Sequence, residues 1–284
     1  MCKKFDYRII FFKCYIQHNL NSLFVFKNGR SDHSNMNNPF LTDESQIKNL
    51  NFFKLGIHSG KGGVGKTFTS INIAYSLAAA GFRVGLLDLD VDCPNVPKFL
   101  GINNLMTRSG SKYEPILHNG VKIASTALLN PSSESPIIIR GPIKHRMLID
   151  LLLNTNWGDI DFLVIDLPPG TADVPLSAMQ LSAIDGLILV TMPTKESLID
   201  TTRAANMAKK LSVKIIGLVE NMSGDIFGKH GEEFAKRLEI PYLGSIPLSK
   251  ETAQINEESG IAFLKNATLK KLGDDLIKTI IRRP

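Results

Sequence analysis

The sequence predicts an α/β protein with a doubly wound, mostly parallel sheet and helices on both of its faces. From residue 55 onward, short apolar runs alternate with helical stretches, which is the pattern of such a fold. Several of these runs are continuous and rich in β-branched residues, as expected of strands that are covered on both faces. In this fold class the ligand site lies at the carboxyl ends of the strands.

The strands and helices can be placed along the chain from these patterns. Strands are expected over residues 54–58, 83–87, 121–125, 162–166, 186–192, 214–219 and 242–246. Helices are expected over residues 66–80, 142–154, 172–181, 195–211, 232–238 and 268–282, and the apolar stripe of the last one predicts packing on the sheet. Residues 103–119 and 127–139 show no regular pattern, so we expect loops there.

The chain of 284 residues is 43% hydrophobic and 21% charged, which argues against a mostly disordered protein. We expect one domain over residues 48–284, preceded by an N-terminal extension over residues 1–47. Residues 1–35 hold +4 of the formal net charge of +6. Three interpretations of this segment remain open: a stretch upstream of a true start at Met36, an arm that binds a membrane surface or partner, or an organelle presequence.

Charge and cysteine content narrow the class of function. The body of the chain is nearly balanced in charge, so we expect no nucleic-acid partner. Cys2, Cys14 and Cys93 are too few and too scattered for a disulfide framework, and they predict a reducing, cytoplasmic location. No apolar run approaches the ~20 residues that a membrane-spanning helix needs, so no transmembrane segment is expected.

Residues 60–67 (GKGGVGKT) match the phosphate-loop pattern G-x-x-x-x-G-K-[ST] in full, between a predicted strand and a predicted helix. Glycines let backbone N–H groups converge on an anion at the positive end of the helix. Lys66 is expected to reach the β and γ oxygens of ATP, and Thr67 to offer its hydroxyl to Mg²⁺. The predicted nucleotide-binding residues here are Gly60, Lys61, Gly62, Gly63, Val64, Gly65, Lys66 and Thr67.

Lys61 is a second, less usual cation in this loop. A side chain at the start of the loop cannot easily fold back onto its own γ-phosphate. It is predicted to reach the nucleotide of a facing subunit, as an arginine finger does in trans, and the alternative is a solvated loop lysine. Lys61 and Lys66 are both candidate catalytic residues.

Polar side chains follow three other strands. Asp88 and Asp90 lie two residues apart, so they share one face of a strand or its extension. Asp166 ends an apolar strand and behaves as a Walker B residue that holds Mg²⁺ or its water. Asn221 can read the edge of adenine with its amide, and the alternative is an ordinary turn residue. Asp92 is expected to be solvated.

The loop resembles that of the deviant phosphate-loop ATPases, a group that includes ParA, MinD, the nitrogenase iron protein and the arsenite-pump ATPases. Further motifs narrow the resemblance to the Mrp-type ATPases, which are iron–sulfur cluster carriers. The matching segments lie in order between residues 48 and 265. They are 59–67 (SGKGGVGKT), 87–97 (LDLDVDCPNVP), 140–142 (RGP), 157–161 (WGDID), 166–173 (DLPPGTAD), 220–223 (ENMS) and 244–247 (GSIP).

This resemblance implies a P-loop NTPase of the SIMIBI type in which the lysine at position 61 marks homodimers that close on ATP and open after hydrolysis. It assigns Asp90 to orienting the attacking water and Asp88 to the Mg²⁺ shell. It also implies that Asn221 contacts adenine and that Pro247 belongs to the segment that packs on the base. The partners that it implies are iron–sulfur assembly or client proteins.

The sequence departs from the family in its thiols. Members usually carry a C-x-x-C pair shortly after the segment that matches 220–223, and this chain has no cysteine there. A [4Fe–4S] cluster normally needs four thiolates, and two subunits would supply only two from Cys93. The thiol count therefore argues against a bound cluster. The alternatives are a ParA- or MinD-like positioning ATPase that acts on a membrane or partner, and a small-molecule kinase or ligase.

The histidines give no sign of a metal site. They share no metal-ligand spacing, and we expect ordinary surface or loop residues at His58, His118, His145 and His230.

Overall fold

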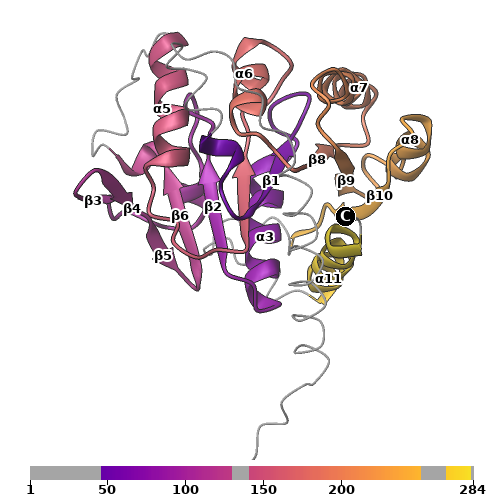
Figure 1. Ribbon diagram of the computed structural model, residues 1–284. Coiled ribbons are helices and arrows are strands. Elements are labelled where there is room, and N and C mark those ends of the chain that lie inside the picture. The colour runs from indigo at the N-terminus through magenta and orange to yellow at the C-terminus, as the bar shows by residue number, and fades with distance from the viewer. Residues whose placement is uncertain (1–45, 130–140, 251–266, 283–284) are drawn as a thin grey trace, which may run out of the picture.

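The computed structural model describes residues 46–129, 141–250 and 267–282 (Figure 1). Almost all of the predicted N-terminal extension lies outside these residues, as does most of the predicted loop at 127–139. Of the extension, residues 46 and 47 are described, and Ile47 is fully buried in the core. Within the described residues, no helix is both long and apolar enough to cross a membrane.

An eight-stranded sheet forms the centre of the molecule (Figure 1). From one edge to the other its strands are β10 (Tyr242–Pro247), β9 (Ile215–Ser223), β8 (Gly186–Thr191), β1 (Phe53–His58), β7 (Phe162–Asp166), β2 (Val84–Asp88), β6 (Val121–Ser125) and β5 (Ile116–His118). All neighbouring pairs are parallel except β5 with β6, which is antiparallel. The predicted doubly wound, mostly parallel fold is confirmed.

Helices cover both faces of this sheet (Figure 1). One face carries α3 (Lys66–Ala79) and α11 (Ala267–Arg282), which pack on each other. The opposite face carries α5 (Gly141–Leu153), α6 (Asp173–Leu181), α7 (Lys195–Lys210) and α8 (Gly231–Arg237). The placement of the helices follows from the strand order. The crossover from β1 to β2 runs toward the β5 edge of the sheet, whereas those from β6 to β10 run toward the β10 edge. Because both are right-handed, their helices lie on opposite faces.

The central strands form the core and carry the site. Every residue of β2, β7 and β8 is buried, as expected of parallel strands between two helical layers. Strands β6 and β7 have the predicted bounds, and the other five predicted strands differ from the observed ones by one to four residues at an end. The predicted packing of the C-terminal helix is also borne out, since α11 contacts β10 as well as α3.

The prediction of a loop over residues 103–119 was wrong. This segment contains the antiparallel pair β3 (Thr107–Ser109) and β4 (Lys112–Glu114), followed by β5. The strands are three residues long and β3 is fully exposed, so they carry no alternating apolar signal. Helix α4 (Val96–Phe99) and the 3₁₀ turn η1 (Thr126–Leu128) are too short to show a helical period, and neither was predicted.

Candidate functional site

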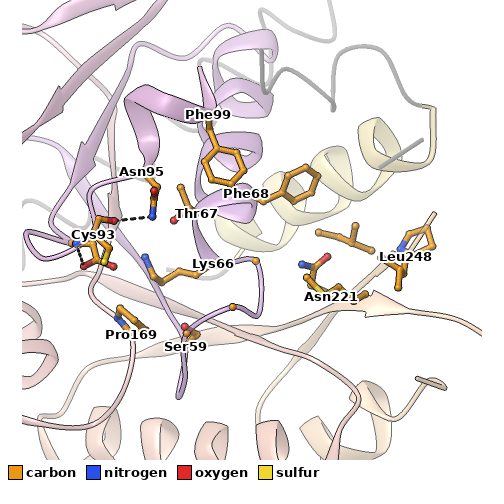
Figure 2. Close-up of a pocket in the computed structure, with 17 residues that line it drawn as sticks. Ser59, Lys66, Thr67, Phe68, Cys93, Asn95, Phe99, Pro169, Asn221 and Leu248 are labelled. Carbon is orange, nitrogen blue, oxygen red and sulfur yellow. Dashed lines mark hydrogen bonds between the residues drawn. The ribbon is translucent and has the colours of Figure 1, made fainter. Parts of the chain in front are cut away.

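The predicted phosphate loop connects β1 to α3 at the carboxyl edge of the sheet (Figure 2). Gly65 is the N-cap of α3 and has a φ of 87°, a left-handed conformation that favours glycine. Within the described residues, no side chain caps this helix and no acidic residue lies in its first turn. The first backbone N–H groups of α3 are therefore available to an anion.

Two distant elements brace this loop. The backbone of α7 lies so close to Gly60 that a Cβ there would collide with the carbonyl group of Asp200. From β9, the Nδ2 of Asn221 donates a hydrogen bond to the carbonyl oxygen of Val64 over 2.9 Å. Asn221 therefore holds the loop in shape through a contact that was not predicted.

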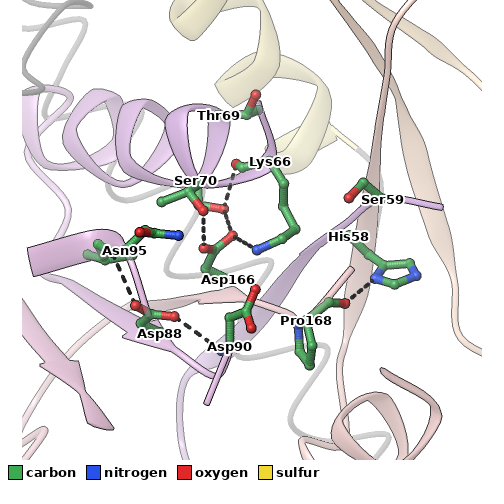
Figure 3. A network of polar contacts seen from close by, with 12 residues as sticks. His58, Ser59, Lys66, Thr69, Ser70, Asp88, Asp90, Asn95, Asp166 and Pro168 are labelled. Carbon is green, nitrogen blue, oxygen red and sulfur yellow. Dashed lines mark hydrogen bonds and ion pairs between the residues drawn. The ribbon is translucent and has the colours of Figure 1, made fainter. Parts of the chain in front are cut away.

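Three side chains from the first turns of α3 contact the carboxylate of Asp166 (Figure 3). Its Oδ1 lies 2.8 Å from the Nζ of Lys66, and both side chains are buried. Thr67 donates its hydroxyl to Oδ2 over 2.7 Å, and Ser70 donates to Oδ1 over 2.7 Å. Ser70 was not predicted, although its position four residues after Lys66 places it on the same face of α3.

Asp88 lies beside Asp166, because the register of β2 and β7 pairs these two residues. Its carboxylate is fully buried and accepts hydrogen bonds from the backbone N–H groups of Asp90 and Val96, both over 3.1 Å, and from the Ser125 hydroxyl over 3.2 Å. Burial and the neighbouring Asp166 raise the pKa of Asp88 to about 7, against the opposing effect of Lys66.

Asp90 stands at the opening of the site rather than in the buried cluster. It is half-buried, and its Oδ1 accepts the backbone N–H of Cys93 over 3.2 Å. Burial raises the pKa of Asp90 from its ordinary value, with Lys66 opposing. Asp92 is exposed, as predicted, and pairs with Lys144.

A pocket of about 560 Å³ opens beside the loop. The predicted site residues that line it are Gly62, Gly63, Gly65, Lys66, Thr67, Asp90, Asn221 and Pro247. The predicted residues that do not line it are Gly60, Lys61, Val64, Asp88 and Asp166. Asp166 is joined to the wall through Lys66 and Thr67, and Asp88 through the backbone of Asp90. Lys61 is half-buried and is not among the residues that line this pocket.

The pocket has two chemically different ends (Figure 2). We call the end near Lys66, Thr67 and Asp90, which also includes Cys93 and Asn95, the charged end. The other, the apolar end, is formed by Phe68, Phe99, Asn221, Ile246, Pro247 and Leu248. Phe68 directly follows the loop motif and could have been found from the sequence, whereas Phe99 belongs to the unpredicted helix α4.

The prediction for the histidines was wrong at His58, which is fully buried at the end of β1. Its Nδ1 lies 3.1 Å from the carbonyl oxygen of Pro168. His118 is half-buried, and its Nδ1 lies 2.5 Å from the Tyr75 hydroxyl. His230 is exposed, in agreement with the prediction.

Comparison with known proteins identifies the family. Residues 52–282 match the family described as NUBPL iron-transfer P-loop NTPase. The chain belongs to this NUBPL-type family. The iron-sulfur cluster carrier protein of Saccharolobus solfataricus is 38% identical to it over 237 residues, which span 78% of this chain and 80% of that protein. The predicted resemblance to the Mrp-type iron–sulfur carriers is confirmed at the level of the family.

Solved structures resemble this NUBPL-type chain over most of its length. The nucleotide-binding protein of Archaeoglobus fulgidus, solved in complex with ADP, has a TM-score of 0.68 and 26% identity, and the match covers 78% of this chain and 94% of that one. The cell division ATPase MinD of Pyrococcus furiosus has a TM-score of 0.67 and 23% identity, covering 82% and 99%. This second likeness shows a shared fold.

The thiols of this NUBPL-type chain are sparse around the site. Cys93 is a free, exposed cysteine at the charged end of the pocket. The segment after Asn221 forms a tight hairpin in which Gly224 and Gly228 exchange backbone hydrogen bonds and Ile226 is exposed. Among the residues that the structure describes, no three His, Cys, Asp or Glu side chains are grouped so that they could hold a metal ion.

Proposed function

We propose that this chain is a Mg²⁺-dependent ATPase that works as a homodimer in iron–sulfur cluster assembly or transfer, in the cytoplasm. The observation that carries the proposal is the cluster of Lys66, Thr67 and Asp166 beside a helix N-terminus that no described side chain caps. Membership of an iron-transfer NTPase family supports the biological role. The name of the Saccharolobus relative, a cluster carrier, supports it further.

The donor set fits ATP with Mg²⁺. A carboxylate, a hydroxyl and a second buried carboxylate are the hard oxygen ligands that Mg²⁺ prefers, directly or through water. Thr67, Asp166 and Asp88 would hold the ion, which would supply positive charge to neutralise the phosphate groups. Lys66 is paired with Asp166 at 2.8 Å, so a triphosphate on the loop would compete with this carboxylate for the ammonium group.

We assign the hydrolytic step to two groups at the opening of the site. Asp90 would orient the attacking water, and its raised pKa suits a carboxylate that takes up a proton. Lys61 does not line the pocket of its own subunit, which is consistent with a role on the facing subunit's γ-phosphate. The base would lie at the apolar end, against Phe68, Pro247 and Leu248, where Asn221 keeps one N–H and its Oδ1 for the adenine edge.

The cluster would be cargo rather than a resident group. Two facing subunits would bring two exposed Cys93 thiols, half of the four that a [4Fe–4S] cluster normally uses. We therefore propose that an assembly or client protein supplies the remaining ligands while the ATPase dimer controls its release.

ATP turnover and association of the purified chain test the enzymatic part. We expect hydrolysis that chelation of Mg²⁺ abolishes, and light scattering that shows a dimer for the Asp90→Asn variant with Mg-ATP. The same variant carrying Lys61→Ala should remain monomeric. Absence of Mg²⁺-dependent turnover would overturn the proposal, and an intact dimer without Lys61 would remove the contact in trans.

Anaerobic reconstitution with iron and sulfide tests the cargo. With the chain alone we expect less than one four-iron cluster per dimer, from the visible absorption spectrum and an iron count. A full, stable [4Fe–4S] cluster on the isolated dimer would contradict the shared-ligand proposal.

A MinD-like positioning role is the second candidate, favoured by the shared fold with a cell division ATPase. The packing of α11 on α3 and β10 argues against a free membrane-binding helix. Sedimentation with anionic liposomes separates the candidates: ATP-dependent binding would favour the positioning role, and we expect none.

A further inference from the structure

His58 is a buried polar side chain that the proposed ATPase chemistry does not use. It is fully buried at the end of β1, directly before the phosphate loop. Its Nδ1 lies 3.1 Å from the carbonyl oxygen of Pro168, in the bend that follows Asp166 (Figure 3). A carbonyl oxygen only accepts, so Nδ1 carries the proton and donates it. Among the described residues Nε2 has no hydrogen-bond partner.

Three consecutive residues of β1 and the loop hold this bend. Ile57 accepts the backbone N–H of Leu167 over 3.1 Å, continuing the ladder between β1 and β7. Ser59 accepts the backbone N–H of Gly170 over 2.9 Å. His58 lies between them and is the one residue of the three that uses its side chain. Its contact can therefore be removed by substitution without altering the backbone bonds directly.

The held bend is a wall of the nucleotide pocket. Pro169 and Ser59 both line the pocket, and Asp166 precedes the bend by two residues. The N–H of Gly170 is engaged by Ser59, so it must leave that carbonyl before it can reach a bound phosphate. The His58 ring interacts with the backbone of Gly170 as well as with that of Pro168, so its side chain acts on both ends of the bend.

We propose that His58 is a positioning residue whose side chain holds the 168–170 bend beside the phosphate loop, so that the Gly170 N–H is placed to exchange the Ser59 carbonyl for a bound phosphate. This rests on the proposed ATPase function, because the bend matters only where a phosphate reaches the charged end. The neutral imidazole suits the task. Burial, and then the charge of Lys66, lowers the pKa of His58 to about 4, so the ring keeps one proton and one orientation at neutral pH.

Two substitutions separate hydrogen bonding from packing. His58→Asn keeps an N–H donor close to the position of Nδ1 but leaves space, whereas His58→Leu fills the space and has no donor. We expect His58→Leu to lower kcat about tenfold with ATP affinity nearly unchanged, and His58→Asn to keep most of kcat. His230→Leu, at an exposed histidine, is the matched control. A Leu variant that equals or exceeds the Asn variant in kcat would overturn the proposal.

Amide hydrogen exchange of the full chain gives a readout that does not depend on turnover. In His58→Leu the Gly170 amide should exchange about tenfold faster than in His58→Asn, while amides in the centre of β1 exchange equally in both. Equal protection of Gly170 in the two variants would overturn the proposal. If the native chain hydrolyses no ATP, the proposed function fails, yet this exchange comparison still decides whether His58 holds the bend.

Discussion

At the charged end of the pocket, Lys66, Thr67 and Ser70 converge on one buried carboxylate at distances of 2.7–2.8 Å. At the apolar end, the hydrophobic side chains of Phe68, Phe99 and Leu248 line the pocket together with the amide of Asn221. The interaction energy of buried charges is large and depends strongly on the distance between them. Each apolar contact contributes little energy, so the loss of one side chain removes only part of the total. We therefore expect single substitutions at the charged end to change the affinity for ATP strongly, and single substitutions at the apolar end to change it only modestly.

Removing the ammonium group at the charged end should have the largest effect. We expect Lys66→Ala to weaken ATP binding roughly 1000-fold, about 4 kcal/mol, because phosphate and Asp166 both lose their buried cation. Isothermal titration calorimetry measures this loss. The exposed Lys210→Ala variant carries the same charge change and should bind normally. An unchanged affinity without Lys66 would refute the assignment of the phosphate loop.

The burial of His58 beside the loop should also make folding stability depend on pH. His58 has its ordinary pKa of 6.5 when unfolded and about 4 when folded. As the pH falls, the unfolded chain therefore takes up this proton first, and stability is lost between these two values while nothing changes above them. Relative to His58→Asn, the native chain should lose about 3 kcal/mol of unfolding free energy from neutral pH to pH 4. Urea unfolding at several pH values measures this, and parallel curves for the two proteins would contradict it.

Substitution of Asp90, at the opening of the site, should lower the rate of ATP hydrolysis without changing ATP binding. Asp90→Asn is expected to lower kcat about 100-fold and to leave the ATP dissociation constant nearly unchanged, because its role lies in orienting water. Asp92→Asn is the matched control, since Asp92 lies two residues away, is exposed and pairs with Lys144. Full turnover of the Asp90 variant in a phosphate-release assay would remove its proposed role.

The smallest effect is expected at the apolar end. Asn221→Ala should weaken ATP binding about tenfold by removing the base contact together with the brace on Val64. The same substitution should weaken the binding of tripolyphosphate only about threefold, because this ligand has no base and is affected only by the lost hydrogen bond to Val64. Ser223→Ala on the same strand, whose hydroxyl contacts the carbonyl of Ile246, is the control. Equal losses for the two ligands would mean that Asn221 only braces the loop.

The fold class, the approximate positions of most elements and the glycine-rich loop at residues 60–67 could be predicted from the sequence alone. These features are local: a strand between two helical layers must be apolar throughout, and a loop that wraps an anion needs glycine at Gly65. Strands β6 and β7 accordingly have their predicted bounds. The carboxylates Asp88 and Asp166 were also foreseeable, because parallel strands end at one edge.

Which distant residues come into contact could be seen only once the chain was folded. Asn221 reaches Val64 across 157 positions, His58 is buried against Pro168 across 110, and Phe99 enters the pocket from a four-residue helix without a periodic signal. The physical reason is that strand order and helix packing set these neighbours. Such long-range contacts depend on how the whole chain winds, and no short stretch of sequence encodes that winding.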